Sequence, residues 1–222
     1  MKHAARWTLK LSALALLAAA LGGCAPLLLG GAVLGTGLVV TDRRTTGIQI
    51  EDEGIELRAA ARVRELATLG QVSLTSYNRL VLITGQVPGA AEKAAVEVAV
   101  ARVENVRSVV NELSVGPSAG LGSRSGDALL STRVKASLVD AKNVQAHAIK
   151  VTTAQGVAYL MGRVTEREAN EAAEVVRSVS GVQKVVRVFE LLSEQELSAL
   201  GRRSASAPAT PAPPAAPAAA RP

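Results

Sequence analysis

The only cysteine of the chain, Cys24, is the residue whose type and place point most directly to chemistry. It follows two glycines and an apolar run over residues 11–21, which in turn follows a basic start. This order is typical of a secretory signal peptide, so residues 1–23 are predicted to be removed on export. Cys24 then begins the mature chain, where its thiol can be modified. A lone cysteine in an exported protein otherwise lacks an explanation.

The motif Leu21-Gly22-Gly23-Cys24 resembles the lipobox of bacterial lipoproteins. The resemblance implies that the thiol carries a diacylglycerol and that the new amino terminus carries a further acyl chain, such as palmitate. Several acyl chains anchor a protein stably, whereas one chain binds only marginally. Ala25, rather than Asp, follows the cysteine. The resemblance therefore implies lipid anchoring at the periplasmic face of the outer membrane. An unmodified thiol after an ordinary signal peptide is the alternative.

Other residues that could do chemistry are few. The mature chain has one histidine, His147, expected at the entry to a strand, and no spacing of His and Cys that suits a metal. We expect four glutamates to form a solvated helix face with neighbouring arginines: Glu166, Glu168, Glu171 and Glu174. The sequence thus predicts no enzymatic activity, no cofactor, no metal site and no small-molecule substrate.

The mature chain is only mildly basic. Removal of residues 1–23 leaves 22 basic side chains against 19 acidic ones, a net charge of +3. Nucleic-acid-binding domains usually carry a strong basic patch, so nucleic acid is not an expected partner. The aromatic residues of the mature chain are Tyr77, Tyr159 and Phe189, so the core is expected to be aliphatic.

An internal repeat organises the rest of the chain. Residues 72–87 align without a gap with residues 149–164, so that Thr75 matches Thr152 and Gly85 matches Gly162 at an offset of 77. A valine-rich segment that follows the first copy recurs after the second at an offset of 76. A repeat of this length indicates two copies of one fold.

Each copy predicts the order αββαβ, with a hairpin between the first two strands. In the first copy we expect helices at 55–66 and 90–103 and strands at 72–75, 80–86 and 106–115. In the second copy we expect helices at 128–139 and 166–179 and strands at 149–153, 157–163 and 182–192. Asp127 is the expected N-cap of the helix at 128–139. The predicted fold class is α+β, with the helices of each copy on one face of a small mixed sheet.

Composition then divides the chain into segments. Residues 117–126 are rich in Gly, Pro and Ser and predict a short linker, and the carboxyl-terminal tail is rich in Ala and Pro. The predicted boundaries are a signal peptide at 1–23, an acylated cysteine and Gly-rich tether at 24–53, a first domain at 54–116, the linker at 117–126, a second domain at 127–193, and an extension with a disordered tail at 194–222.

Two motifs give the repeat a family resemblance. Leu-Ile-Thr-Gly-Gln-Val ends at Val87 and Tyr-Leu-Met-Gly-Arg-Val ends at Val164, each followed by a helix and a valine-rich strand. Both copies resemble BON domains. The resemblance implies a non-catalytic envelope protein that binds phospholipid, supports outer-membrane integrity and gathers at division sites where anionic phospholipid is exposed.

The residues themselves favour one helix as the binding surface. Residues 117–150 carry five basic and two acidic side chains, an excess that no other part of the repeat shows. Leu130, Val134 and Leu138 recur every four residues and predict the core stripe of the helix at 128–139. Leu129 lies about 100° away from Leu130 on a helix. The candidate phospholipid-binding residues are Leu129, Arg133, Ala136 and Ser137.

Two alternatives stay open at this point. Leu129 could instead complete the core or pack on the first copy. The two BON copies could also bind another envelope protein, in assembly or in a stress response, without touching lipid. The expected partners are therefore the membrane, through the acyl anchor and anionic phospholipid, and envelope proteins in the alternative.

Overall fold

The computed structural model describes residues 42–66, 70–117 and 120–206. Cys24 and the signal peptide lie outside these residues. The first domain consists of α2 (Thr46–Glu65), β1 (Gln71–Tyr77), β2 (Leu80–Val87), α3 (Ala90–Ala101) and β3 (Ser108–Val115). The second consists of α4 (Leu121–Asp140), a short helix η2 (Ala146–Ala148), β4 (Ile149–Ala154), β5 (Val157–Val164), α5 (Glu166–Arg177) and β6 (Lys184–Leu191), and α6 (Glu194–Ser206) follows.

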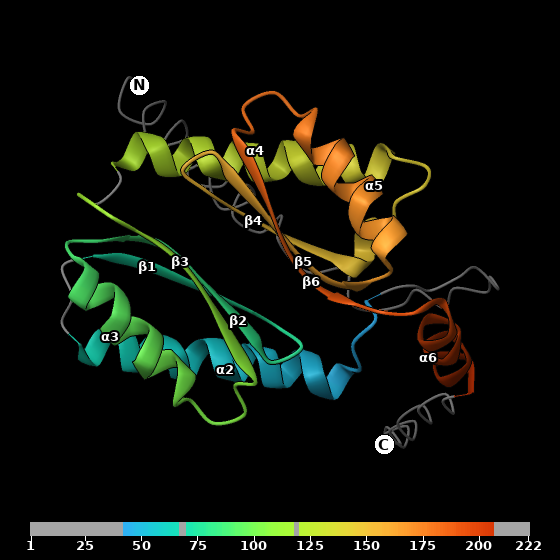
Figure 1. Ribbon diagram of the computed structural model, residues 1–222, viewed down its shortest axis with the longest axis horizontal. Coiled ribbons are helices and arrows are strands. Elements are labelled where there is room, and N and C mark those ends of the chain that lie inside the picture. Colours follow the sequence, from blue (N-terminus) through green and yellow to red (C-terminus); the bar gives the residue numbers. More distant parts are fainter. Residues whose placement is uncertain (1–41, 67–69, 118–119, 207–222) are drawn as a thin grey trace, which may run out of the picture. The chain divides into compact units, whose positions relative to one another are not determined.

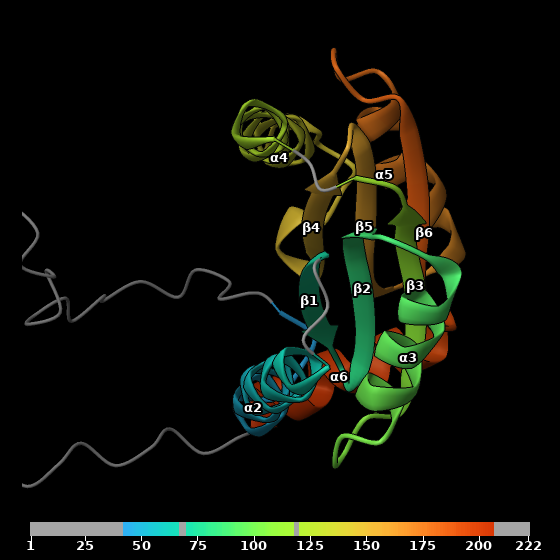
Figure 2. The ribbon, with the colours of Figure 1, turned by 90° about the vertical axis from the view of Figure 1, so that its left-hand side faces the viewer.

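The predicted order αββαβ and the α+β class are confirmed in both copies. Each copy has a three-stranded sheet, in the order β1-β2-β3 or β4-β5-β6, with the middle strand antiparallel to the first and parallel to the last. Helices α2 and α3 cover one face of the first sheet, and α4 and α5 cover one face of the second (Figures 1 and 2). The sheets are therefore mixed, as predicted.

Aliphatic side chains fill the space between the helices and the sheet of each domain. In the second domain Leu130, Val134 and Leu138 of α4 are buried in this core, which confirms the predicted core stripe. In the first domain Ile55 and Ala59 of α2 occupy the corresponding places against β2. Aliphatic side chains pack well without aromatic rings because interiors are filled by shape and volume.

The glycine of each family motif is required by a close approach of two backbones. A Cβ added to Gly85 would lie 2.0 Å from the carbonyl oxygen of Gln71, and one added to Gly162 would lie 2.4 Å from that of Ala148. Gly85 also has φ +119°, a conformation that side chains rarely adopt. The motif glycine therefore lies where the second strand has no room for a side chain against the neighbouring backbone.

The second face of each sheet is buried against the other copy. Tyr77 and Leu82 of the first domain form one apolar cluster with Tyr159, Met161 and Val188 of the second. Because side chains alternate along a strand, the residues between those of the helix-side core point into this cluster. The linker does not leave the domains independent: they share a core.

Equivalent residues meet across this shared core. The hydroxyls of Thr75 and Thr152, which occupy the same place in the repeat, lie 3.4 Å apart. Asn78 donates to Glu190 at 2.6 Å. The repeat-related pair, Gln155 and Ser114, is bonded at 2.9 Å. The copies thus pack through matching surfaces, as the two halves of a symmetric dimer do.

Residues 42–45, which we call the N-terminal strap, bind both domains. Arg43 donates both guanidinium arms to the carboxylate of Glu168 on α5, at 2.6 and 2.7 Å. Arg44 bonds Asp52 of α2 at 2.7 Å and lies over the ring of Tyr77 at 4.1 Å. Arg43 therefore binds the second domain, and the adjacent Arg44 binds the first.

Asp52 is the most connected carboxylate of the first domain and is only 2% exposed. It accepts hydrogen bonds from the amides of Asn78 and Arg79, from the Ser76 hydroxyl and from Arg44. Burial alone would raise the pKa of Asp52, but these hydrogen bonds outweigh burial and hold the pKa below its ordinary value.

Several expectations about local structure are wrong. Helix α2 begins at Thr46 rather than at residue 55, with Thr45 as its N-cap. Helix α4 begins at Leu121 with Gly120 as N-cap, so Asp127 lies inside the helix and does not cap it. Glu168 is only 5% exposed because it completes a capping box with Thr165 and pairs with Arg43. It is therefore not part of a solvated face.

The close approach at Gly85 predicts a large stability loss for Gly85→Ala. The added methyl group must displace the Gln71 carbonyl and adopt an unfavourable φ, so we expect the free energy of unfolding to fall by about 2–4 kcal/mol. Gly122→Ala is the matched control: it lies in exposed α4 with no atom within 4 Å of the added Cβ. This control is expected to gain up to about 1 kcal/mol. Urea unfolding measures both changes, and equal effects would contradict the assignment.

The lowered pKa of Asp52 predicts acid sensitivity. The unfolded chain binds this proton more tightly than the folded chain, so the contribution of Asp52 is present above about pH 4 and is lost as pH falls below that value. At pH 7 we expect Asp52→Asn to lower the free energy of unfolding by about 2–4 kcal/mol, because the buried amide cannot accept the same bonds. Urea titrations between pH 7 and pH 3 should show the two proteins converge. A constant difference across that range would contradict this role.

Candidate functional site

Helix α4 presents a second, outward stripe opposite its core stripe. Leu129, Thr132, Ala136 and Val139, which we call the outward stripe, recur at spacings of three and four residues and are all exposed. This spacing places them on one face of a helix. Leu129 is 61% and Val139 63% exposed, although both side chains are large and apolar. The outward stripe therefore offers apolar surface to something outside the described residues.

The structure places the four predicted residues on α4 but not all equally outward. Leu129 and Ala136 belong to the outward stripe. Leu129 does not complete the core and does not pack on the first domain, because most of its side chain is exposed. Arg133 is exposed beside them, and its guanidinium donates to the Ser180 carbonyl at 3.0 Å. Ser137 is half-buried, nearer the core stripe.

Sequence reasoning missed three members of this surface. Thr132 and Val139 complete the outward stripe, and Lys135 adds an exposed cation along its other flank. Among the described residues, no ion pair involves Lys135, Arg124, Arg133 or Lys142. The signal was present in the spacing from Leu129 to Val139, which the predicted helix at 128–139 already contained.

The orientation of α4 is fixed from its inner side by Asp127. The carboxylate of Asp127 accepts from the amides of Gln155 and Gly156, at 2.8 and 3.0 Å. These two residues form the β4–β5 turn and both have positive φ, as a tight hairpin turn requires. Asp127 thus has the same role as Asp52 of the first domain: each carboxylate bonds the helix to the turn between the first two strands. The core stripe of Leu130, Val134 and Leu138 packs against the sheet. The outward stripe, on the opposite side of α4, therefore points away from the sheet.

The other candidate residues do not form a site. His147 is exposed in the middle of the short helix η2, two residues before the start of β4. Within the described parts of the chain, no group of three or more His, Cys, Asp or Glu side chains could hold a metal ion. In the same residues, no helix is both long and apolar enough to cross a bilayer.

Comparison with known proteins places the chain in a family. The sequence profile of the BON domain matches residues 54–117 and 126–192. The outer membrane lipoprotein DolP of Haemophilus influenzae is 38% identical over 175 residues, which cover 78% of this chain and 90% of DolP. The 21 kDa hemolysin of Actinobacillus pleuropneumoniae is 34% identical over 151 residues, which cover 67% of this chain and 78% of the hemolysin. Neither relative is named as an enzyme.

A solved structure adds nothing to this placement. The C-terminal domain of CdsD, a type III secretion protein of Chlamydia trachomatis, covers 62% of this chain and 96% of its own length at 11% identity, with a TM-score of 0.27. That score is too low to support an inference. The assignment rests on the two BON matches and on the likeness to DolP over most of both chains. The chain belongs to the BON domain family and is a DolP-like, dual-BON lipoprotein anchored by lipid in the outer membrane.

Proposed function

We propose that the second BON domain binds anionic phospholipid through the outward stripe of α4 and the cations beside it. The observation that carries the proposal is the exposure of Leu129 and Val139 beside Arg133 and Lys135, two cations that form no ion pair among the described residues. Leu129, Arg133, Ala136 and Ser137 are the predicted contacts, extended here by Thr132, Lys135 and Val139. Through this contact the protein would support envelope integrity, including at division sites, as the family resemblance implies.

The chemistry of the surface suits a lipid headgroup boundary. Removing a leucine-sized side chain from water contributes about 1.5–3 kcal/mol when it is fully buried. Each Lys or Arg near an anionic membrane surface adds about 1 kcal/mol. Apolar and electrostatic contributions of similar size predict binding that depends on both anionic lipid and ionic strength. The single acid beside the stripe, Asp140, weakens this field only in part.

The N-terminal strap brings the anchored end of the chain to the same helix. Asp42 and Arg44 line a cavity of about 410 Å³ together with Lys135 and Val139 of α4. The eighteen residue-to-residue steps from Cys24 to Asp42 can span at most about 60 Å. An acylated Cys24 would therefore keep α4 within reach of the bilayer and raise its effective concentration there.

Leu129→Glu should abolish most vesicle binding. The measurement is co-sedimentation of the mature chain, made with Cys24→Ser so that no acyl chain contributes, with vesicles of phosphatidylglycerol and phosphatidylcholine. The lost apolar contact and the added negative charge are each worth at least about 1 kcal/mol, which together predict a loss of more than about tenfold in affinity. Leu57→Glu is the matched control, because Leu57 is 73% exposed on the corresponding helix of the first domain. It should bind as the unchanged protein does.

Two outcomes would count against the proposal. Equal binding by the Leu129→Glu protein would remove α4 from the lipid contact. No binding of phosphatidylglycerol vesicles by the unchanged domains would favour the alternative, in which the BON copies bind an envelope protein without direct lipid contact.

Acylation at Cys24 predicts a separate result in cells. The mature protein should carry acyl chains on Cys24 and its amino group, detected by mass spectrometry of the amino-terminal peptide. Cys24→Ser should leave the protein unacylated and move it out of the membrane fraction, because no anchor of several chains remains. An unmodified sulfur in the unchanged protein, found in the soluble fraction, would contradict the anchor.

A further inference from the structure

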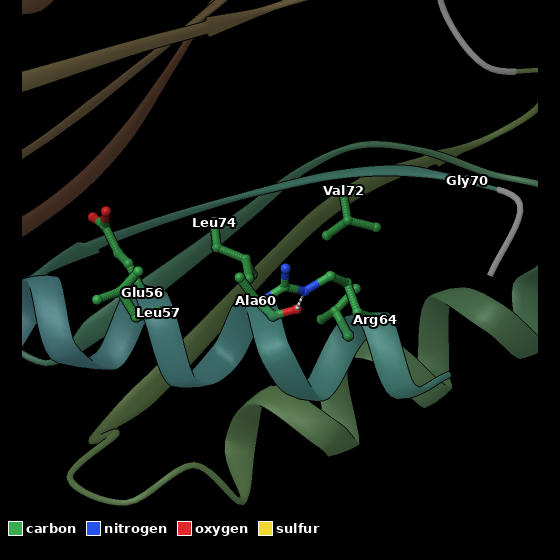
Figure 3. Close-up of a pocket in the computed structure, with 8 residues that line it drawn as sticks. Glu56, Leu57, Ala60, Arg64, Gly70, Val72 and Leu74 are labelled. Atoms are coloured by element: carbon green, nitrogen blue, oxygen red, sulfur yellow. Dashed lines mark hydrogen bonds between the residues drawn. The ribbon is translucent and has the colours of Figure 1, made fainter. Parts of the chain in front are cut away.

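A cavity of the first domain lies away from α4. It has a volume of about 640 Å³ and runs between α2 and the edge of β1 (Figure 3). Leu57, Ala60 and Arg64 of α2 form one wall, and Val72 and Leu74 of β1 form the other (Figure 3). We call this cavity the edge groove.

The backbone of β1 faces the edge groove with hydrogen-bonding groups. Strand β1 is at the edge of its sheet, and Ser76 shows which residues point outward: its amide donates to Glu56 Oε1 at 2.7 Å instead of to β2. Backbone direction alternates along an antiparallel edge strand, so Val72 and Leu74 present their N–H and C=O groups the same way. Such a row is a template for an added strand.

The corresponding part of the second domain contains apolar side chains of the chain itself. The connection from helix to first strand has eight residues there (141–148) but five in the first domain (66–70). The longer connection carries Val144 into the helix–sheet core, where it is 9% exposed, and Ala146 packs beside it. Ala146 also lines the corresponding cavity of the second domain, together with Asp42 and Arg44 of the N-terminal strap.

The charges at the two ends of the edge groove differ. Glu56 closes the end near Ser76, where it also accepts from Lys150 at 2.9 Å. Arg64 stands near the other end; its Nε donates to the Ala60 carbonyl, and no carboxylate pairs with it among the described residues. The end of the groove beside Arg64 is therefore cationic and suits an acidic residue.

We propose that the edge groove binds an extended segment of a partner protein, which pairs with β1 as a fourth strand. Its inward side chains are apolar where they meet Leu57 and Leu74 and acidic where they meet Arg64. Strand addition of this kind takes affinity from main-chain hydrogen bonds and specificity from alternate side chains. The site lies on another domain than the lipid contact, so either proposal can fail without the other.

A designed peptide tests the edge groove directly. The probe is acetyl-Thr-Val-Thr-Leu-Thr-Glu-amide, which places two apolar side chains and one carboxylate on the same side of a strand. Its partner is the isotope-labelled mature chain with Cys24→Ser. We expect the amide signals of Val72 and Leu74 to shift, and exchange of their protons to slow. Arg64→Glu should weaken binding of this probe by about tenfold and favour the peptide that ends in Lys instead of Glu.

A second pair of variants separates the main-chain contact from general loss of structure. Val72→Pro removes one outward donor, and Val72→Ala is its control because the Val72 side chain also packs against the helix–sheet core. The proline variant should weaken the probe more than the alanine variant does. Leu129→Glu should leave peptide binding intact, and Leu57→Glu should weaken it. The proposal is overturned if no shift appears at Val72 and Leu74 at millimolar peptide. It is also overturned if the shifts map to another surface, or if Arg64→Glu leaves the preference for Glu over Lys unchanged.

Discussion

Each small sheet of this protein has two faces to bury and helices for only one of them. The second face carries Tyr77 and Leu82 in one copy and Tyr159 and Met161 in the other, and these side chains form one apolar cluster. Burial of apolar surface is the main favourable contribution to folding, and a small three-stranded sheet leaves too much exposed on its own. The pairing of the two copies therefore decides which surfaces remain outside, including the outward stripe of α4 and the edge groove beside α2.

The N-terminal strap adds a second constraint on the same arrangement. Arg43 and Arg44 are neighbours in sequence but pair with Glu168 and Asp52 in different domains. Removing one charge of a buried ion pair lowers stability far more than an exposed ion pair raises it, because the other charge stays buried without a partner. The strap thus joins the anchored end of the chain to both domains at once, and a pull on the anchor would be shared by both.

The sequence allowed the fold and the core of α4 to be predicted because both depend on local periodicity. The spacing of Leu130, Val134 and Leu138 and the repeat of the Gly85 and Gly162 motifs were enough. Residues whose role depends on partners far away in the sequence were not predictable in this way. Asp127 was predicted to be an N-cap, because its bonds to the β4–β5 turn become visible only in the fold. Glu168 reads as a surface charge until Arg43 reaches it from more than a hundred residues away.

The contact of α4 with lipid can be measured with a single fluorescent side chain. The only tryptophan of the chain, Trp7, precedes Cys24, so a mature chain carries none of its own. Tryptophan placed in turn at positions 129, 139 and 57 reports burial in vesicles of brominated phosphatidylglycerol by quenching of its fluorescence. The account predicts strong quenching and a blue shift at 129 and 139 and neither at 57. Equal quenching at all three positions, or none at 129 and 139, would contradict it.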